Sequence, residues 1–226
     1  MRTVAMLRSA GVGAGDEVVV PAYGNMEIAQ SVVDSGARPV FADVDPATYC
    51  LSSAAVGSAL SPRTAAVIAV HRFGMPADMG PLRAFGQLHG LLVLERTEDA
   101  ADDEGAGPRR ARAAYLDARL TGVLPPVSTA GHTYLQYVVR VPGNGRPDRD
   151  AFARALRAKG VGCRVPVQTP LHRTHRFRSD AWLPETERAA DETLALPIGP
   201  ELSRRDLQRL VSACNALGGL LEAAFV

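Results

Sequence analysis

The sequence predicts an α/β fold, in which a parallel or mixed sheet carries helices on both faces and a small α+β domain follows. Short runs of Val, Ile and Leu alternate with helical patterns through the first half of the chain. Continuous apolar runs of strand length are typical of parallel strands that are buried on both faces. We expect strands at 18–22, 39–44, 66–71 and 91–95, with helices at 25–35, 52–60 and 77–88. The crossovers between these strands should be right-handed.

The second half of the chain mixes helices with shorter strands, as an α+β domain does. We expect strands at 134–141 and 162–167, and helices at 109–120, 148–158, 185–195 and 203–217. The domain boundary falls in the run EDAADDEGAGPRRAR at 98–112, where few apolar side chains are available to pack. The sequence therefore predicts a first domain at 1–97, a linker at 98–111 and a second domain at 112–226.

Charge and composition exclude several classes of protein. The 226 residues include 25 basic and 24 acidic side chains, so the net charge of +1 gives no strong field toward nucleic acid. No apolar stretch approaches the ~20 residues that span a bilayer, and Met1 leads into no signal-peptide core. The three cysteines form no paired metal motif or disulfide framework. We expect a cytoplasmic protein without bound metal that binds neither nucleic acid nor membranes.

Eight stretches in order resemble one family, the DegT/DnrJ/StrS sugar aminotransferases, which are fold-type I enzymes dependent on pyridoxal phosphate. The stretches include GVGAGDEVVVPAY (11–23), SGARPVFADVDPATY (35–49), SPRTAAVIAVHRFGMPADM (61–79), HGLLVLE (89–95), RRARAAYLDARL (109–120) and HTYLQYVVRV (132–141). The series ends with KGVGCRVPVQTPLH (159–172) and ETLALPIGPELSRRDL (192–207). The resemblance implies that 1–97 corresponds to a shortened large domain and 112–226 to the small C-terminal domain.

The resemblance also implies a cofactor lysine, and this chain departs from the family pattern there. Family members place that lysine in a segment between the fifth strand and the arginine-rich helix, where this chain has only residues 96–108. Lys159 is the only lysine among 25 basic residues, and it lies at the end of a predicted helix, where a solvent-exposed cation is favoured.

Other cofactor contacts of the family also differ. A gapless match places Arg96 where the family has an aspartate against the pyridine nitrogen, whereas a three-residue insertion would place Asp99 near that position. Asn25 and Met26 stand where an aromatic group stacks on the ring, and the chain begins inside the helix that follows the phosphate loop. We therefore expect no pyridoxal phosphate and no transaminase activity.

Several polar residues are candidates for other chemistry. His71, Glu95 and His172 are candidate acid–base groups, and Arg96 and Arg164 are candidate binding residues. His71 ends an apolar strand, and the carboxyl ends of parallel strands face the usual ligand crevice. The run LHRTHRFR at 171–178 is cationic, and we interpret it as solvated surface rather than as an anion site.

Two functions fit this pattern. The first is a pseudoenzyme with the aminotransferase fold that acts by binding, as an accessory protein in sugar or natural-product biosynthesis. The second is a cofactor-independent cyclase, dehydratase or isomerase that uses the old interdomain cleft on a small biosynthetic intermediate. In both cases the strand at 91–95 should be an apolar edge, covered by residues 96–108, by a second copy in a homodimer, or by another subunit in a hetero-oligomer.

Overall fold

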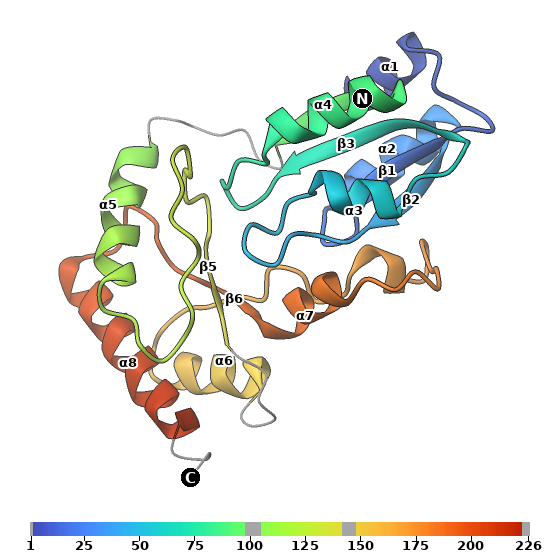
Figure 1. Cartoon of the computed structure of the whole chain (residues 1–226). Helices are drawn as coiled ribbons and strands as arrows, with labels where there is room; N and C mark the ends of the chain where they lie inside the picture. The colour runs from blue at the N-terminus through green and yellow to red at the C-terminus, as the bar shows by residue number, and fades with distance from the viewer. Residues whose placement is uncertain (1, 98–104, 142–147, 223–226) are drawn as a thin grey trace. The chain divides into compact units, whose positions relative to one another are not determined.

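A computed structural model describes residues 2–97, 105–141 and 148–222 and divides the chain into two compact units (Figure 1). The first unit comprises 1–72, 76–99 and 169–187, and the second comprises 73–75, 100–168 and 188–226. This division differs from the predicted domains, because 169–187 belongs to the first unit rather than to the second. Residues 98–104 of the predicted linker lie outside the described residues, and from residue 106 onward the chain is helical.

Two sets of contacts hold 169–187 in the first unit. The backbone N–H of Leu171 donates to the carbonyl oxygen of Ala22 at 2.9 Å. The carboxylate of Asp43 accepts from the backbone N–H groups of Glu185 and Thr186, at 3.0 and 2.7 Å. These N–H groups are in the first turn of a helix, where they have no acceptor within the helix, and the Asp43 carboxylate supplies one.

The first unit contains a four-stranded parallel sheet in the order β2-β1-β3-β4, as the sequence predicted. Val19 of β1 pairs with Val40 of β2, and Val67 of β3 pairs with Val93 of β4. The strand order reverses between β1 and β3, which is where ligands bind in open α/β sheets. The strands are β1 (Glu17–Pro21), β2 (Arg38–Ala42), β3 (Thr64–His71) and β4 (Leu92–Thr97).

Helices connect the strands and cover the two faces of the sheet. α1 packs against α2, and α3 packs against α4. Right-handed crossovers to opposite sides of β1 place α2 and α3 on opposite faces. Asn25 and Ser52 cap the starts of α2 and α3, and Gly36 and Gly90 end α2 and α4 in the left-handed conformation. The helices are α1 (Arg2–Ser9), α2 (Met26–Ser35), α3 (Ser53–Ser58), α4 (Met79–His89) and the 3₁₀ turn η2 (Leu171–Arg173).

The second unit is built on a two-stranded antiparallel sheet, in which Val139 pairs with Leu194. The prediction of a strand at 162–167 is wrong, because this segment contributes only a bridge between Arg164 and Ala195. The predicted helix at 185–195 ends earlier, and its last residues form a fully buried strand instead. The elements are α5 (Ala106–Asp117), β5 (Tyr137–Arg140), α6 (Arg149–Ala158), β6 (Thr193–Leu196) and α8 (Arg204–Glu222), while α7 (Pro184–Glu192) runs from one unit into the other.

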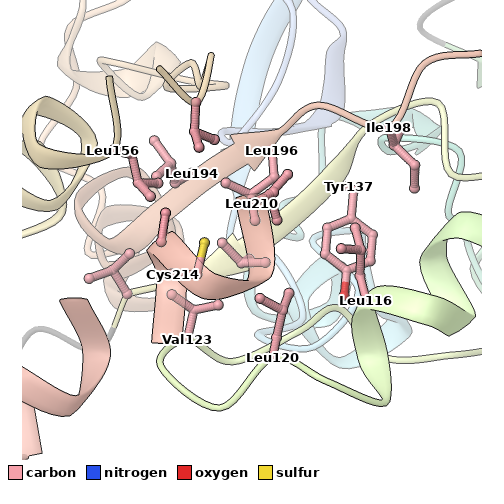
Figure 2. Close-up of a cluster of buried hydrophobic side chains, with 14 of the residues drawn as sticks. Leu116, Leu120, Val123, Tyr137, Leu156, Leu194, Leu196, Ile198, Leu210 and Cys214 are labelled. Atoms are coloured by element: carbon pink, nitrogen blue, oxygen red, sulfur yellow. The ribbon is translucent and has the colours of Figure 1, made fainter. Parts of the chain in front are cut away.

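The core of the second unit lies between the small sheet and its helices, as Figure 2 shows. Tyr137 is fully buried, and its hydroxyl donates to a carboxylate oxygen of Asp117 at 2.5 Å. Burial raises the pKa of Asp117, and burial together with this carboxylate raises the pKa of Tyr137. The labelled core side chains are Leu116, Leu120, Val123, Tyr137, Leu156, Leu194, Leu196, Ile198, Leu210 and Cys214.

Candidate functional site

Two adjoining pockets lie at the carboxyl ends of β3 and β4, on the first unit. One has a volume of about 550 Å³ and the other about 250 Å³, and both are lined by Arg2, Arg96 and Thr97. The larger pocket extends along α2 from Asn25 to Asp34, and the smaller one extends over His71 and Glu95. This position agrees with the rule that ligand crevices form outside the carboxyl ends of parallel strands. We call the two pockets together the carboxyl-end crevice.

His71 and Glu95 are in direct contact in this crevice. The Nε2 atom of His71 lies 2.8 Å from Oε1 of Glu95, and its Nδ1 accepts from the backbone N–H of Ala77 at 2.9 Å. Because Nδ1 accepts, the neutral ring must hold its proton on Nε2 and donate it to Glu95. Arg83 also donates to Glu95, at 2.6 Å. In the parallel register Glu95 of β4 pairs with Ala69 of β3, and His71 lies two residues further along β3 on the same face, so the two side chains meet diagonally.

Arg96 lies between the two pockets, next to Glu95 in β4. Its Nε atom is buried and has no hydrogen-bond partner among the described residues. A buried donor without an acceptor costs free energy, so this guanidinium favours an incoming anion. The alternative residue Asp99 lies outside the described residues, and the structure places only Arg96.

The start of α2 contributes a second feature that favours an anion. Asn25 caps this helix by accepting from the backbone N–H of Glu27 at 2.8 Å, and both residues line the larger pocket. The positive end of a helix dipole stabilises negative charge. The basic residues of the larger pocket are Arg2, Arg96 and Arg176, and its acidic residues are Glu27 and Asp34. The balance is one net positive charge.

His172 does not line either pocket. Its side chain is fully buried, with Nε2 3.1 Å from Oε1 of Glu187, and Arg173 donates to the same oxygen through Nε at 2.8 Å. These two donors, the histidine first, lower the pKa of Glu187. The hydrogen bond of His172 therefore links the 3₁₀ turn to α7. Because the side chain is fully buried and lines neither pocket, we assign it a structural role.

Arg164 and Lys159 belong to the second unit. The backbone of Arg164 exchanges hydrogen bonds with that of Ala195, at 3.1 and 2.8 Å, and its side chain is exposed. Lys159 is the exposed residue that ends α6. The amine required for a covalent bond to the cofactor is thus absent from the sequence of the first unit.

Sequence reasoning did not select Arg2, Arg83, Thr97 or Arg176, all of which contact or line the crevice. Thr97 could have been found, because it follows Glu95 and Arg96 at the end of the same strand. The arginines come from helices and from a loop distant in sequence, and no local pattern places them there. Within the described ranges, no group of histidine, cysteine and carboxylate side chains is arranged to hold a metal ion.

Solved structures define the class of protein to which this fold belongs. The aminotransferase TlmJ from Streptoalloteichus hindustanus superposes with a TM-score of 0.86 at 25% identity, over 98% of this chain and 84% of that chain. The ntda protein of Bacillus subtilis, crystallised with bound cofactor PMP, superposes with a TM-score of 0.86 at 16% identity, over 96% of this chain and 71% of that chain. The fold is that of the fold-type I aminotransferases, as predicted.

Sequence comparison identifies the family. The chain belongs to the DegT/DnrJ/EryC1/StrS aminotransferase family, whose model matches residues 3–114 and 103–215. The L-glutamine:2-deoxy-scyllo-inosose aminotransferase of Streptomyces lividus is 33% identical over 97% of this chain and 50% of that enzyme. The pleiotropic regulatory protein of Geobacillus stearothermophilus is 27% identical over 91% of this chain and 79% of that protein. The chain therefore spans about half the length of the S. lividus enzyme.

The expectation that no cofactor binds is wrong. The matched family is an aminotransferase family, and a structural neighbour holds PMP, so the comparisons point to pyridoxal phosphate rather than to no cofactor. The residues of the crevice fit one part of this group: the unpaired Nε of Arg96 and the start of α2 suit a phosphate. They do not supply the lysine of a covalent link. No helix in the described part of the chain is long and apolar enough to cross a membrane.

Proposed function

We propose that this chain is a binding member of its family, which takes a vitamin B6 phosphate in the carboxyl-end crevice without a covalent bond. The observation that supports this most is Arg96, whose buried Nε has no acceptor within the described residues, in a chain whose single lysine lies in the other unit. Arg96, Arg2 and the start of α2 would hold the phosphate. When bound, pyridoxal phosphate supplies an electron sink for carbanion chemistry.

The proposal assigns the chain an accessory role in sugar or natural-product biosynthesis, and no transaminase activity of its own. The inositol-derived substrate in the name of the S. lividus relative supports this area of metabolism. A lysine is the group that bonds covalently to this cofactor and moves protons beside it in transaminases. The position of β4 at the end of the sheet supports a second copy or another subunit as partner.

Arg96→Gln should weaken binding of pyridoxamine phosphate by about tenfold or more, because a charge-assisted hydrogen bond to the phosphate is lost. Equilibrium dialysis measures this, with Arg154→Gln on an exposed face of α6 as the matched control. Lys159→Arg should leave the affinity unchanged. The noncovalent proposal would be refuted by borohydride-reduced cofactor on Lys159 in stoichiometric amount, or by amino transfer that Lys159→Arg abolishes.

The contact between His71 and Glu95 supports a second candidate function, acid–base catalysis of a cyclisation, dehydration or isomerisation at this crevice. A general acid needs a proton on a defined atom that faces the substrate. In the neutral ring this proton lies on Nε2 of His71 and is donated to Glu95, so a substrate in the crevice would have to replace Glu95 as the acceptor before His71 could act as the acid.

Long-range ¹H–¹⁵N NMR at pH 8 should show neutral His71 with Nε2 protonated and Nδ1 unprotonated. His89 provides the comparison, because it is exposed at the end of α4 and should show a mixture of both forms. Observation of the Nδ1–H form at His71 would contradict the assigned proton position and this candidate function with it.

A further inference from the structure

A pocket of about 630 Å³ lies at the amino ends of β1 and β2, at the opposite end of these strands from the carboxyl-end crevice. Three parts of the first unit line it: the start of β1 with β2 and Val33 of α2, the turn from 59 to 63, and the segment 176–181. Figure 1 shows segment 176–181 in orange, on the part of the chain that precedes α7. We call it the amino-end pocket. Arg176 also lines the larger pocket of the carboxyl-end crevice, but no residue of the amino-end pocket is among the proposed phosphate contacts, which are Arg2, Arg96 and the start of α2.

Four arginines line the amino-end pocket: Arg38, Arg63, Arg176 and Arg178. Glu17 is the only acidic residue among the residues that line it, so its lining has three net positive charges. The arginines come from three separate parts of the sequence, around 38, 63 and 176–178, and the fold brings these parts together. A concave surface with one sign of charge concentrates ligands of the opposite sign.

Glu17 is fully engaged by its neighbours. Its carboxylate accepts from Arg38 at 2.5 Å, from Nε of Arg63 at 2.9 Å and from the hydroxyl of Ser61 at 2.6 Å. The Glu17 side chain is only 3% exposed, whereas those of Arg38 and Arg63 are 64% and 65% exposed. Glu17 therefore orients the two guanidinium groups, and their remaining N–H donors face solvent.

Arg176 and Arg178 form no ion pair within the described residues. Arg176 lies over the ring of Phe177, with its Cζ 5.9 Å from the ring centroid. Ser179 also lines the pocket, and its hydroxyl is buried without a hydrogen-bond partner among the described residues. A buried hydroxyl without a partner is uncommon in folded proteins, and an anion in the pocket would supply an acceptor.

The floor of the pocket is apolar. Phe41 and Phe177 meet edge to face there, with ring centroids 5.8 Å apart, beside Val33, Val40 and Ala181. Clefts of 300–1,000 Å³ with an apolar lining and a few convergent polar groups are typical of small-molecule sites. An inorganic anion would leave this floor in contact with water.

We propose that the amino-end pocket binds a diphosphate ester, with the diphosphate on the arginines and the organic group on the apolar floor. A diphosphate monoester carries about three negative charges near neutral pH, which match the three net positive charges of the lining. Each guanidinium can bind two phosphate oxygens, so two arginines without an ion pair in the described part of the chain, together with two that Glu17 orients, suit two linked phosphate groups better than one.

Isothermal titration calorimetry with adenosine diphosphate and with inorganic pyrophosphate tests the proposal on the full chain. Adenosine diphosphate should bind more tightly than pyrophosphate, and its affinity should fall with rising salt concentration. Arg178→Gln, which does not touch the carboxyl-end crevice, should weaken binding about tenfold or more. Ala181→Glu, which adds a negative charge to the pocket, should weaken it further. Arg154→Gln should bind as the wild-type chain does.

Three results would overturn the proposal: no binding of adenosine diphosphate, equal affinity for pyrophosphate, or an affinity that Arg178→Gln leaves unchanged. Far-UV circular dichroism of each variant shows whether it folds, and Arg178 is exposed and without an ion pair among the described residues, so its replacement should not disturb the fold. Arg178→Gln should leave the affinity for pyridoxamine phosphate unchanged, because Arg178 lines only the amino-end pocket whereas Arg176 lines both pockets. This last measurement separates failure at the amino-end pocket from failure at the carboxyl-end crevice.

Discussion

Glu17→Gln should lower the free energy of unfolding of the first unit by about 2–3 kcal/mol at pH 7. Hydrogen bonds from Ser61 and Arg38 lower the pKa of Glu17 from 4.5 to about 2. The glutamine keeps the shape of the side chain but loses the charge that these donors and Arg63 pair with. The exposure of both arginines reduces the effect, because solvent screens them. Urea denaturation followed by circular dichroism measures the change.

The effect should depend on pH with a defined sign. The pKa of Glu17 is lower in the folded chain than in the unfolded chain, so its contribution is fully present above about pH 4.5 and is lost as the pH falls toward 2. The difference in the free energy of unfolding between the wild-type chain and Glu17→Gln should therefore shrink as the pH falls over this range. Glu27→Gln, at an exposed position without an ion pair among the described residues, is the control. If this difference in the free energy of unfolding stays constant down to pH 2, the lowered pKa of Glu17 is not the cause of the stabilisation.

Gly74→Ala should destabilise the second unit by about 3 kcal/mol. Gly74 has a φ of +86°, and a methyl group there would overlap the hydroxyl of Thr133 and approach the backbone nitrogens of Tyr134 and Leu135. Positive φ disfavours an L side chain, and overpacking against backbone adds to that cost. The thermal midpoint of unfolding, followed by circular dichroism, should fall accordingly.

Gly90→Ala separates the two causes. Gly90 also has a positive φ, of +66°, but a methyl group there would meet no atom within 4 Å. Its replacement should cost about 1 kcal/mol, which reflects backbone strain alone. Equal losses of stability in the two variants would show that the predicted overlap at Gly74 does not occur.

The sheet of the first unit was predictable because its strands are apolar runs that alternate with helical patterns along the chain. The run around Val67 is buried on both faces, and its eight-residue strand leaves no ambiguity with a helix. The strand at Thr193–Leu196 has only four residues and follows a helix without a break, so the sequence pattern extended the helix through it. The hydrogen bonds that pair this segment with β5 make it a strand, although its local sequence continues the helical pattern.

Part of the carboxyl-end crevice was predictable for the same reason. His71 ends β3, and Glu95 and Arg96 lie among the last three residues of the neighbouring parallel strand β4, so their proximity follows from the order of the strands. The placement of Arg2 and Arg176 depends on how α1 and the segment before α7 fold back on the sheet, which no local spacing encodes. His172 looked similar to His71 in the sequence, but burial against Glu187 distinguishes it.

The expectation of no cofactor rested on the missing lysine together with departures from the family pattern at Arg96, at Asn25 and Met26, and at the phosphate loop, and it is wrong because these departures do not exclude binding of the phosphate by other groups. A lysine accounts for the covalent bond, whereas phosphate recognition depends on separate donors. The run at 171–178 was interpreted as solvated surface, and its arginines are indeed exposed, but Arg176 and Arg178 also line the amino-end pocket together with Arg38 and Arg63. Convergence of distant segments is a property of the fold that sequence alone does not show.

The place of β4 at the end of the sheet has a consequence for deuterium labelling. In the described residues, β4 pairs only with β3, so alternate amides of Leu92–Thr97 point away from any partner strand. These amides should exchange within seconds, while those of β3, which is paired on both edges, stay protected for much longer. A subunit that adds a strand there would be recognised by slowed exchange at every second position.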